Sequence, residues 1–154
     1  MSAVEPLEPV SLMGFKYRVT LGETTKLGFS KVSGLQATVG EMIWEEINDP
    51  ATGVKLPDRI TLADVTLERG VDKSSSMYAW YSTVLRTLRY QNDKIFRRTV
   101  TIEVLPKGEG NGKKFKMFEA WPKVMRWSDL DAGSSGIFIE SLTLAHEGIV
   151  RLPG

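Results

Sequence analysis

Residues 59–90 constrain the fold most, because they hold the one convincing helix signal in a chain that otherwise reads as strand and loop. Apolar residues recur there at positions i, i+3, i+4, i+7, i+8 and i+11, which places them along one helical face. They are Met77, Trp80, Tyr81, Val84, Leu85 and Leu88. Asp72, Ser74 or Ser75 can cap the first turn with a side-chain oxygen. A lone amphipathic helix in a β-rich chain must bury its apolar face, so we expect it to cover a sheet.

Alternation of apolar and polar residues predicts strands along most of the remaining chain. The predicted strands are residues 15–21, 27–38, 42–47, 59–69, 97–105, 114–120, 123–127 and 137–149. The apolar parity changes within 59–69, which indicates a bulge near Ala63 or a strand buried on both faces. Gly28 and Gly34 are expected bend points. The pattern predicts a mainly β (α+β) fold, an antiparallel barrel or sandwich of about seven strands with one flanking helix.

Proline and glycine mark the boundaries between these elements. Residues 1–14 contain Pro6 and Pro9 and have no periodicity, so we expect an extended amino-terminal arm before a single β domain at 15–154. Residues 48–58 form the longest break and are predicted to be a long projecting loop that carries function or a contact. Trp121-Pro122 is expected to end or kink a strand, because proline cannot donate to a ladder.

Composition excludes several classes of function. The chain has 154 residues, of which 42% are hydrophobic and 25% charged, as is ordinary for a single globular domain. A net charge of +1 argues against a bulk nucleic-acid or membrane-surface binder. Because there is no cysteine, a disulfide scaffold, a thiolate metal site and a cysteine nucleophile are excluded. The first nine residues lack the features of a signal peptide, so we expect the protein to fold in a cytoplasm.

Catalytic and cofactor motifs are not evident in the sequence. His146 is the only histidine, and we interpret it as a strand residue satisfied by a neighbour. Asp129 and Asp131 lack the spaced oxygen ligands of a calcium loop. The glycines at 108, 110 and 112 do not precede a helix, so they form no phosphate cradle. We therefore expect no enzymatic activity, no metal and no cofactor.

Local charge and aromatic residues favour contacts between copies of the chain. Acidic residues cluster near Trp44 and basic residues around 86–98, which suggests a head-to-tail assembly of identical subunits; a mixed solvated surface is the alternative. Trp44 itself suits either a subunit contact or simple packing. The candidate subunit-interface residues are Val4, Pro6, Leu7, Trp44, Glu45, Glu46, Asp49, Lys55, Arg97 and Arg98.

Several short segments, in this order, resemble the tail tube proteins of contractile phages. They are FSKVSGL at 29–35, ITL at 60–62, TLERG at 66–70, AWP at 120–122 and ESLTLAHEG at 140–148. The resemblance spans roughly 15–149 and extends to tube subunits of extracellular contractile injection systems and R-type bacteriocins.

The resemblance implies a small β-barrel with a flanking helix that assembles into stacked hexameric rings forming a hollow tube. It implies as partners a contractile sheath, baseplate and terminator proteins, a tape-measure protein, and DNA or effector cargo in the bore. It also implies that the arm at 2–13 and the segment 43–58 make subunit contacts. Two other hypotheses stay open from the residues alone: a monomeric small-ligand barrel with tryptophans lining its interior, and an enzyme using His146.

Overall fold

The structure is a computed structural model that describes residues 17–23, 25–46, 49–70, 75–90, 96–105, 112–130, 132–133 and 138–153. It contains β1 (Tyr17–Leu21), β2 (Thr25–Phe29), β3 (Lys31–Ser33), β4 (Ala37–Glu46), β5 (Asp49–Leu62), β6 (Val65–Gly70), α2 (Ser76–Tyr90), β7 (Arg98–Val104), β8 (Lys114–Trp127), β9 (Ile139–Ala145) and β10 (Gly148–Leu152). The expected mainly β fold with one flanking helix is confirmed for these residues. Within them, no helix has the length and apolarity needed to cross a membrane.

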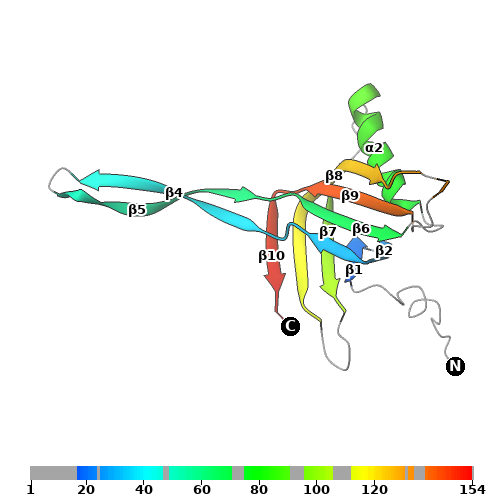
Figure 1. The fold of residues 1–154 in the computed structure, drawn as a ribbon, viewed down its shortest axis with the longest axis horizontal. Coiled ribbons are helices and arrows are strands. Elements are labelled where there is room, and N and C mark those ends of the chain that lie inside the picture. Colours follow the sequence, from blue (N-terminus) through cyan, green and yellow to red (C-terminus); the bar gives the residue numbers. More distant parts are fainter. Residues whose placement is uncertain are drawn as a thin grey trace.

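Eight strands form one rolled antiparallel sheet in the order β2-β1-β7-β8-β9-β6-β3, and β10 also pairs with β8. The long strand β8 turns the corner between two halves of this sheet. Its first half pairs with β7 and β10, and its second half pairs with β9. The strands of the two halves cross at a wide angle (Figure 1), as in an orthogonal sandwich.

Two irregularities let β8 bend at this corner. The register against β7 shifts between Arg98 and Val100, and Glu119 adopts a left-handed φ of 54° on the facing segment of β8. The register against β9 shifts between Pro122 and Val124. Extra residues of this kind bend a strand and increase its local twist. The expected kink at Trp121-Pro122 is therefore confirmed, but the strand continues through it to Trp127.

The roll of the sheet brings β2 and β3, the two ends of the strand order, together along the chain. Ser30 joins them, and both its backbone N–H and its hydroxyl donate to the carbonyl oxygen of Glu68, at 2.9 and 3.2 Å. The two ends are thus linked by one residue rather than by a ladder. The sandwich alternative holds, and the closed barrel does not.

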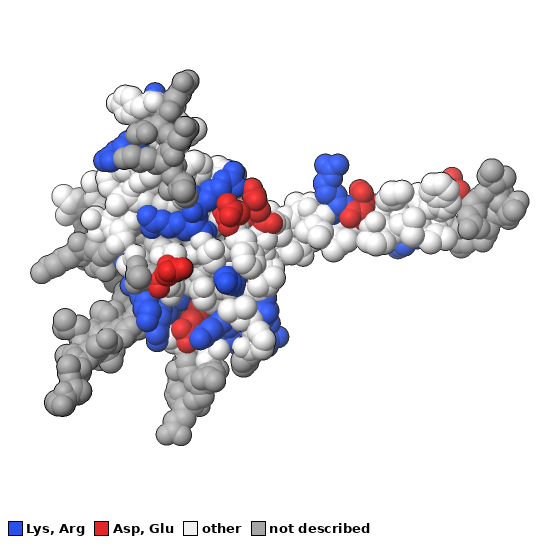
Figure 2. All heavy atoms as spheres, turned by 180° about the vertical axis from the view of Figure 1, so that it is seen from behind, with Lys and Arg blue, Asp and Glu red and all other residues white. Residues whose placement is uncertain are grey.

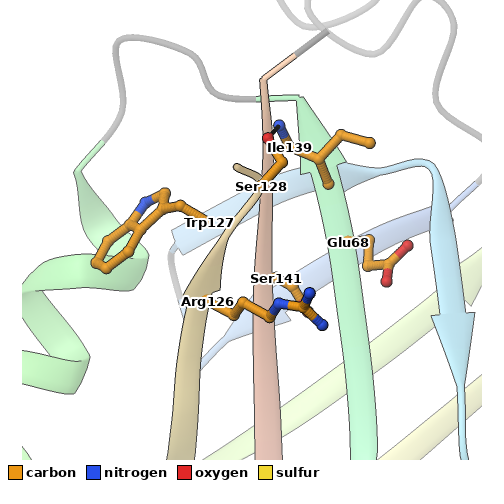
Figure 3. A pocket seen from close by; sticks show the side chains of 6 residues that line it. All are labelled: Glu68, Arg126, Trp127, Ser128, Ile139 and Ser141. Atoms are coloured by element: carbon orange, nitrogen blue, oxygen red, sulfur yellow. Dashed lines mark hydrogen bonds between the residues drawn. The ribbon is translucent and has the colours of Figure 1, made fainter. Parts of the chain in front are cut away.

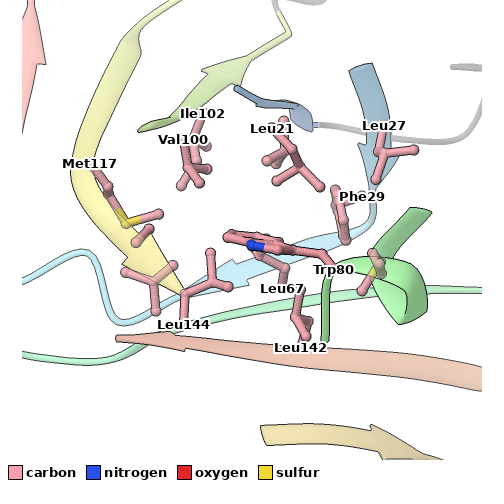
Figure 4. Close-up of a cluster of buried hydrophobic side chains, with 14 residues drawn as sticks. Leu21, Leu27, Phe29, Leu67, Trp80, Val100, Ile102, Met117, Leu142 and Leu144 are labelled. Atoms are coloured by element: carbon pink, nitrogen blue, oxygen red, sulfur yellow. The ribbon is translucent and has the colours of Figure 1, made fainter. Parts of the chain in front are cut away.

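The core lies between the two halves of the sheet and under the helix (Figure 4). Strand alternation supplies it, since β1, β6, β7 and β9 each point every second residue inward. The buried apolar residues of this cluster are Val19, Leu21, Leu27, Phe29, Val65, Leu67, Met77, Trp80, Val100, Ile102, Met117, Ala120, Leu142 and Leu144. Burial of this surface is the main favourable term in folding.

The helix α2 begins as the sequence predicts and is covered over only part of its length. The carbonyl of Ser75 accepts from the N–H of Ala79 at 2.8 Å, so Ser75 directly precedes the first helical turn. A cap by its side-chain oxygen stays a prediction, and the other proposed caps lie outside the described residues. Met77, Trp80 and Val84 are buried, and the indole N–H of Trp80 donates to the carbonyl of Phe96 at 2.6 Å.

The expectation that the whole apolar face of α2 is buried is wrong at its end. Leu88 is 73% exposed, and Tyr90 is exposed as well. The carboxy-terminal part of the helix stands away from the sheet in Figure 1, so nothing within the described part of the subunit covers it. The periodicity of the sequence continues past the point where the sheet surface ends.

Strands β4 and β5 pair only with each other and form a long hairpin that projects from the body (Figure 1). Three predicted boundaries change as a result. The expected loop at 48–58 is mostly strand, because β5 begins at Asp49. The predicted strand at 59–69 is two strands, broken at Ala63-Asp64, and this break, rather than a bulge, causes the parity change. The predicted strand at 27–38 is divided among β2, β3 and the start of β4.

The predicted strand at 137–149 is likewise two strands. β9 pairs with β6 and with the second half of β8, whereas β10 pairs with the first half of β8. His146 and Glu147 make the turn between them, and the N–H of Glu147 donates to the carbonyl of Phe118 at 2.9 Å. The chain thus passes from one half of the sheet to the other at this turn.

Candidate subunit interface

Exposed large apolar residues gather on the β4–β5 hairpin more than on any other described element. Its exposed large apolar residues are Val39, Met42, Ile43, Trp44, Val54, Leu56 and Ile60. In the space-filling view of Figure 2 it is a narrow projection on which few charged side chains appear. A two-stranded hairpin is marginally stable by itself in water, and an exposed apolar patch of this kind marks an interaction site.

The strand register assigns these side chains to two faces. Met42 lies opposite Leu56, and Trp44 lies opposite Val54, which places all four on one side of the hairpin. We call this set the Trp44 face. It carries no charge, and each of its members is exposed.

The other face of the hairpin mixes apolar and charged residues. Ile43 lies opposite Lys55, and Val39 lies opposite Ile60. The ammonium of Lys55 is 3.9 Å from a carboxylate oxygen of Glu41, with both side chains mostly exposed. A pair this exposed contributes at most about 1 kcal/mol, so it marks polarity rather than stability.

The hairpin is anchored to the body at Ala63-Asp64. The N–H of Ala63 donates to the carbonyl of Gln36 at 3.1 Å, which closes the base of the hairpin. Lys123 of β8 bonds the carboxylate of Asp64 at 2.9 Å. Gly34, with φ of +90°, passes so close to Asp64 that a Cβ atom there would lie 2.1 Å from its carbonyl oxygen. Only glycine fits this crossing.

His146 takes part in the same anchor. Its Nε2 lies 2.9 Å from the carbonyl oxygen of Ala63, and its Nδ1 lies 3.2 Å from that of Gly148. The prediction that His146 has neighbours for its polar atoms is confirmed, and both neighbours are backbone carbonyl groups. The predicted position in a strand is wrong, because His146 lies in the turn between β9 and β10. A neutral imidazole has one ring N–H, so in either tautomer it donates to one of these two carbonyl oxygens. The side chain lies between the base of the hairpin and the β9–β10 turn, which is a structural position.

The structure brings together only some of the candidate interface residues. Trp44, Glu45 and Lys55 lie exposed on the hairpin. Glu46 and Asp49 are register partners toward its tip, and their side chains lie outside what the structure describes. Val4, Pro6 and Leu7, with the whole predicted arm, also lie outside the described residues. Their part in subunit contacts stays a prediction.

Arg97 and Arg98 lie on the body at the start of β7 and already have contacts within the subunit. Arg97 bonds the carboxylate of Glu147. The guanidinium of Arg98 lies 5.2 Å from the centre of the Trp80 ring, a cation–π distance. Both line a surface hollow with Lys116, so this region is basic, as the sequence indicates. Whether it meets an acidic neighbour stays a prediction.

Sequence reasoning missed Met42, Val54 and Leu56, which the structure adds to the candidate interface as exposed apolar residues. Residues 54 and 56 alternate with Lys55, which is a strand signal, but Pro50 and Pro57 favoured a loop. Both prolines are tolerated because each strand of a two-stranded hairpin is an edge, where a missing N–H breaks few bonds. The alternation of apolar Val54 and Leu56 with Lys55 was the sequence signal that could have identified this strand.

The tryptophans occupy four separate places. Trp80 is in the core, and Trp44 is on the hairpin. Trp121 packs edge-to-face on Phe96 at 6.3 Å, as expected for a packed corner. Trp127 lies 6.1 Å from Tyr78 of α2. They do not line one interior cavity, which removes the main support for a small-ligand barrel. Among the described residues, no three potential metal ligands cluster.

Comparison with known proteins places the chain among tail tube proteins. The sequence model of the family described as T4-like virus tail tube protein gp19 matches residues 13–150. No curated protein sequence matches the chain.

Several solved structures have a fold similar to this one. The tube-terminating cap of the anti-feeding prophage matches with a TM-score of 0.74 and 18% identity over 100% of this chain and 95% of that one. A chain of the PVC sheath–tube complex in the extended state matches with a TM-score of 0.75 and 18% identity, over 98% of this chain and 99% of that one. Hcp1 from Flavobacterium johnsoniae matches with a TM-score of 0.59 and 13% identity over 91% and 97%. At these identities the likeness shows a shared fold.

Proposed function

This chain belongs to the T4-like virus tail tube protein family, and we propose that it is the structural subunit of the inner tube of a contractile tail or injection machine. In this proposal, copies assemble into hexameric rings that stack into a hollow conduit for DNA or effectors. The observation that carries the proposal is the β4–β5 hairpin, a projecting element with exposed apolar side chains on both faces.

Such a hairpin requires neighbours on both sides. The Trp44 face and the opposite face, with Ile43 and Ile60, are each exposed in the single subunit. The body cannot cover them, because the hairpin extends away from it (Figure 1). One hairpin therefore contacts more than one other copy, as suits a subunit held within a ring and between rings.

The similar structures supply the expected surroundings. One is a tube-terminating cap, one belongs to a sheath–tube complex, and a further one comes from a baseplate described as 6-fold symmetrised, with a TM-score of 0.73 and 21% identity over 99% of this chain and 96% of that one. By this likeness we propose sheath, baseplate and terminator proteins as partners, with a tape-measure protein or cargo in the bore. Assembly in a bacterial cytoplasm, before incorporation into the particle, completes the proposal.

Electron microscopy of the purified protein tests this proposal. Negative-stain images at increasing concentration should show sixfold rings, then tubes of many stacked rings. Single rings or caps that never extend into tubes would contradict the stacking part of the proposal. Compact monomers at every concentration and salt would contradict the proposal. Changing Glu45→Lys together with Glu46→Lys tests the electrostatic part, and normal tubes from this variant at low salt would remove it.

A further inference from the structure

A second group of exposed apolar residues lies at the end of the body that is farthest from the hairpin. It combines side chains from α2, the end of β8 and the start of β9, and we call it the end patch. Its members, all exposed, are Tyr78, Trp127, Leu130, Phe138 and Ile139. Strand β6 runs toward this end from the base of the hairpin, so body length separates the two surfaces (Figure 1).

The end patch borders a hollow of about 220 Å³. Its wall is a row across three strands, in which Ser141 of β9 lies opposite both Arg126 of β8 and Glu68 of β6. Trp127, Ser128 and Ile139 complete the lining, as Figure 3 shows. The N–H of Ile139 donates to the hydroxyl of Ser128 at 2.9 Å, and the N–H of Ser128 donates to the carbonyl of Ile139 at 2.8 Å. These two bonds hold the rim in place.

We propose that this hollow is the socket for Trp44 of a second copy, an inference that rests on the proposed function. The Trp44 face would lie on the end patch with the indole inserted beside Trp127 and Ile139. The volume of the hollow is several times the ~30 Å³ that one water occupies, so the hollow can admit a large side chain. Aromatic anchors that fill a pocket dominate the energetics of interfaces.

The polar atoms of the hollow match the needs of an indole. A buried tryptophan N–H requires an acceptor. The carboxylate of Glu68 and the hydroxyl of Ser141 supply acceptors on the wall, where the side chain of Arg126 extends toward Glu68 (Figure 3), and the apolar lining residues are Trp127 and Ile139. The Arg126 guanidinium can lie against the face of an indole ring.

The positions of the two surfaces also fix the kind of assembly. The hairpin and the socket are different surfaces at opposite ends, so the contact is heterologous, and each copy both donates a hairpin and receives one. In a head-to-tail arrangement such a contact continues around a ring or along a stack, whereas a reciprocal exchange of hairpins would stop at a dimer. A chain with one projecting end and one receiving end is thus built to propagate.

Cross-linking tests the socket directly, because the chain has no cysteine of its own. A Val54→Cys, Ile139→Cys variant places one thiol beside Trp44 and one in the socket. The matched control is Val54→Cys, Val150→Cys, since Val150 on β10 is 45% exposed and Ile139 is 41% exposed. A short bis-maleimide is added to assembled protein, and covalent multimers are separated under denaturing conditions.

We expect the Ile139 variant to give a ladder of multimers at least tenfold stronger than the control. Rings or tubes with an equal or stronger ladder from the Val150 variant would overturn the socket and leave the proposed function standing. Wild-type protein that never assembles would overturn both. As a second variant, Ser141→Phe fills the hollow; unchanged assembly of this variant, with an unchanged melting temperature, would also overturn the socket.

Discussion

Replacement of Trp44 by alanine separates assembly from folding. Trp44 is 55% exposed in the single subunit. If a fully exposed tryptophan presents about 250 Å², its cover by a neighbour removes roughly 140 Å² from water. At about 25 cal/mol per Å² this is about 3 kcal/mol for complete burial. The concentration at which rings form should therefore rise roughly 100-fold in Trp44→Ala.

The stability of the folded subunit should change little in Trp44→Ala. Trp44 contributes no core contact, and loss of its cross-strand pair with Val54 costs about 0.2–1 kcal/mol. We expect the melting temperature of the monomer to fall by less than about 4 °C. Sedimentation velocity against concentration measures assembly, and circular dichroism measures melting. Trp44→Phe, which keeps most of the apolar area, is the control and should assemble at nearly wild-type concentration.

Two outcomes would refute this reasoning. If Trp44→Ala assembles at the wild-type concentration, the Trp44 face stays exposed in the assembly, and the role assigned to it is wrong. If the variant melts far below the wild type, Trp44 supports the fold of the subunit, and its effect on assembly carries no information about an interface.

Three further changes test the arm and the anchor of the hairpin. Gly34→Ala should destabilise the subunit by about 3 kcal/mol or more, because it adds backbone strain and an overlap with Asp64. The control Gly22→Ala, with nothing within 4 Å of its Cβ, should cost about 1–2 kcal/mol. Urea unfolding measures both free energies, and equal losses would contradict the anchor. His146→Phe should cost about 1–3 kcal/mol and speed amide exchange at the base of the hairpin, and unchanged exchange there would refute its structural role. Deletion of residues 2–13 should weaken ring stacking with the domain still folded, and unaltered tubes would count against the arm.

Several elements of this chain could be predicted from local sequence patterns alone. Val100 and Ile102 alternate in β7, and Met77, Trp80 and Val84 repeat at helical spacing, so these elements and their inward faces could be predicted. Local alternation is decided by the geometry of one strand or one helix, and it needs no knowledge of neighbours. The same holds for the kink at Pro122.

Tertiary structure decided where each strand belongs. Residues 59–69 look like one strand, yet the chain passes at Ala63-Asp64 from a free hairpin to the body. The end of α2 looks buried, yet Leu88 extends past the sheet. Periodicity states which side of an element is apolar, but not whether another element reaches that side.

By itself, the sequence determined a β-rich domain with one amphipathic helix, and its motif order indicated the tail tube family. Only the folded chain showed that Met42, Trp44, Val54 and Leu56 share one uncovered face, since the pairing of two strands sets this. Only the fold placed Glu68, Arg126 and Ser141 in one row, because they come from three strands far apart in the chain. Burial and juxtaposition are properties of the whole sheet, and no single segment encodes them.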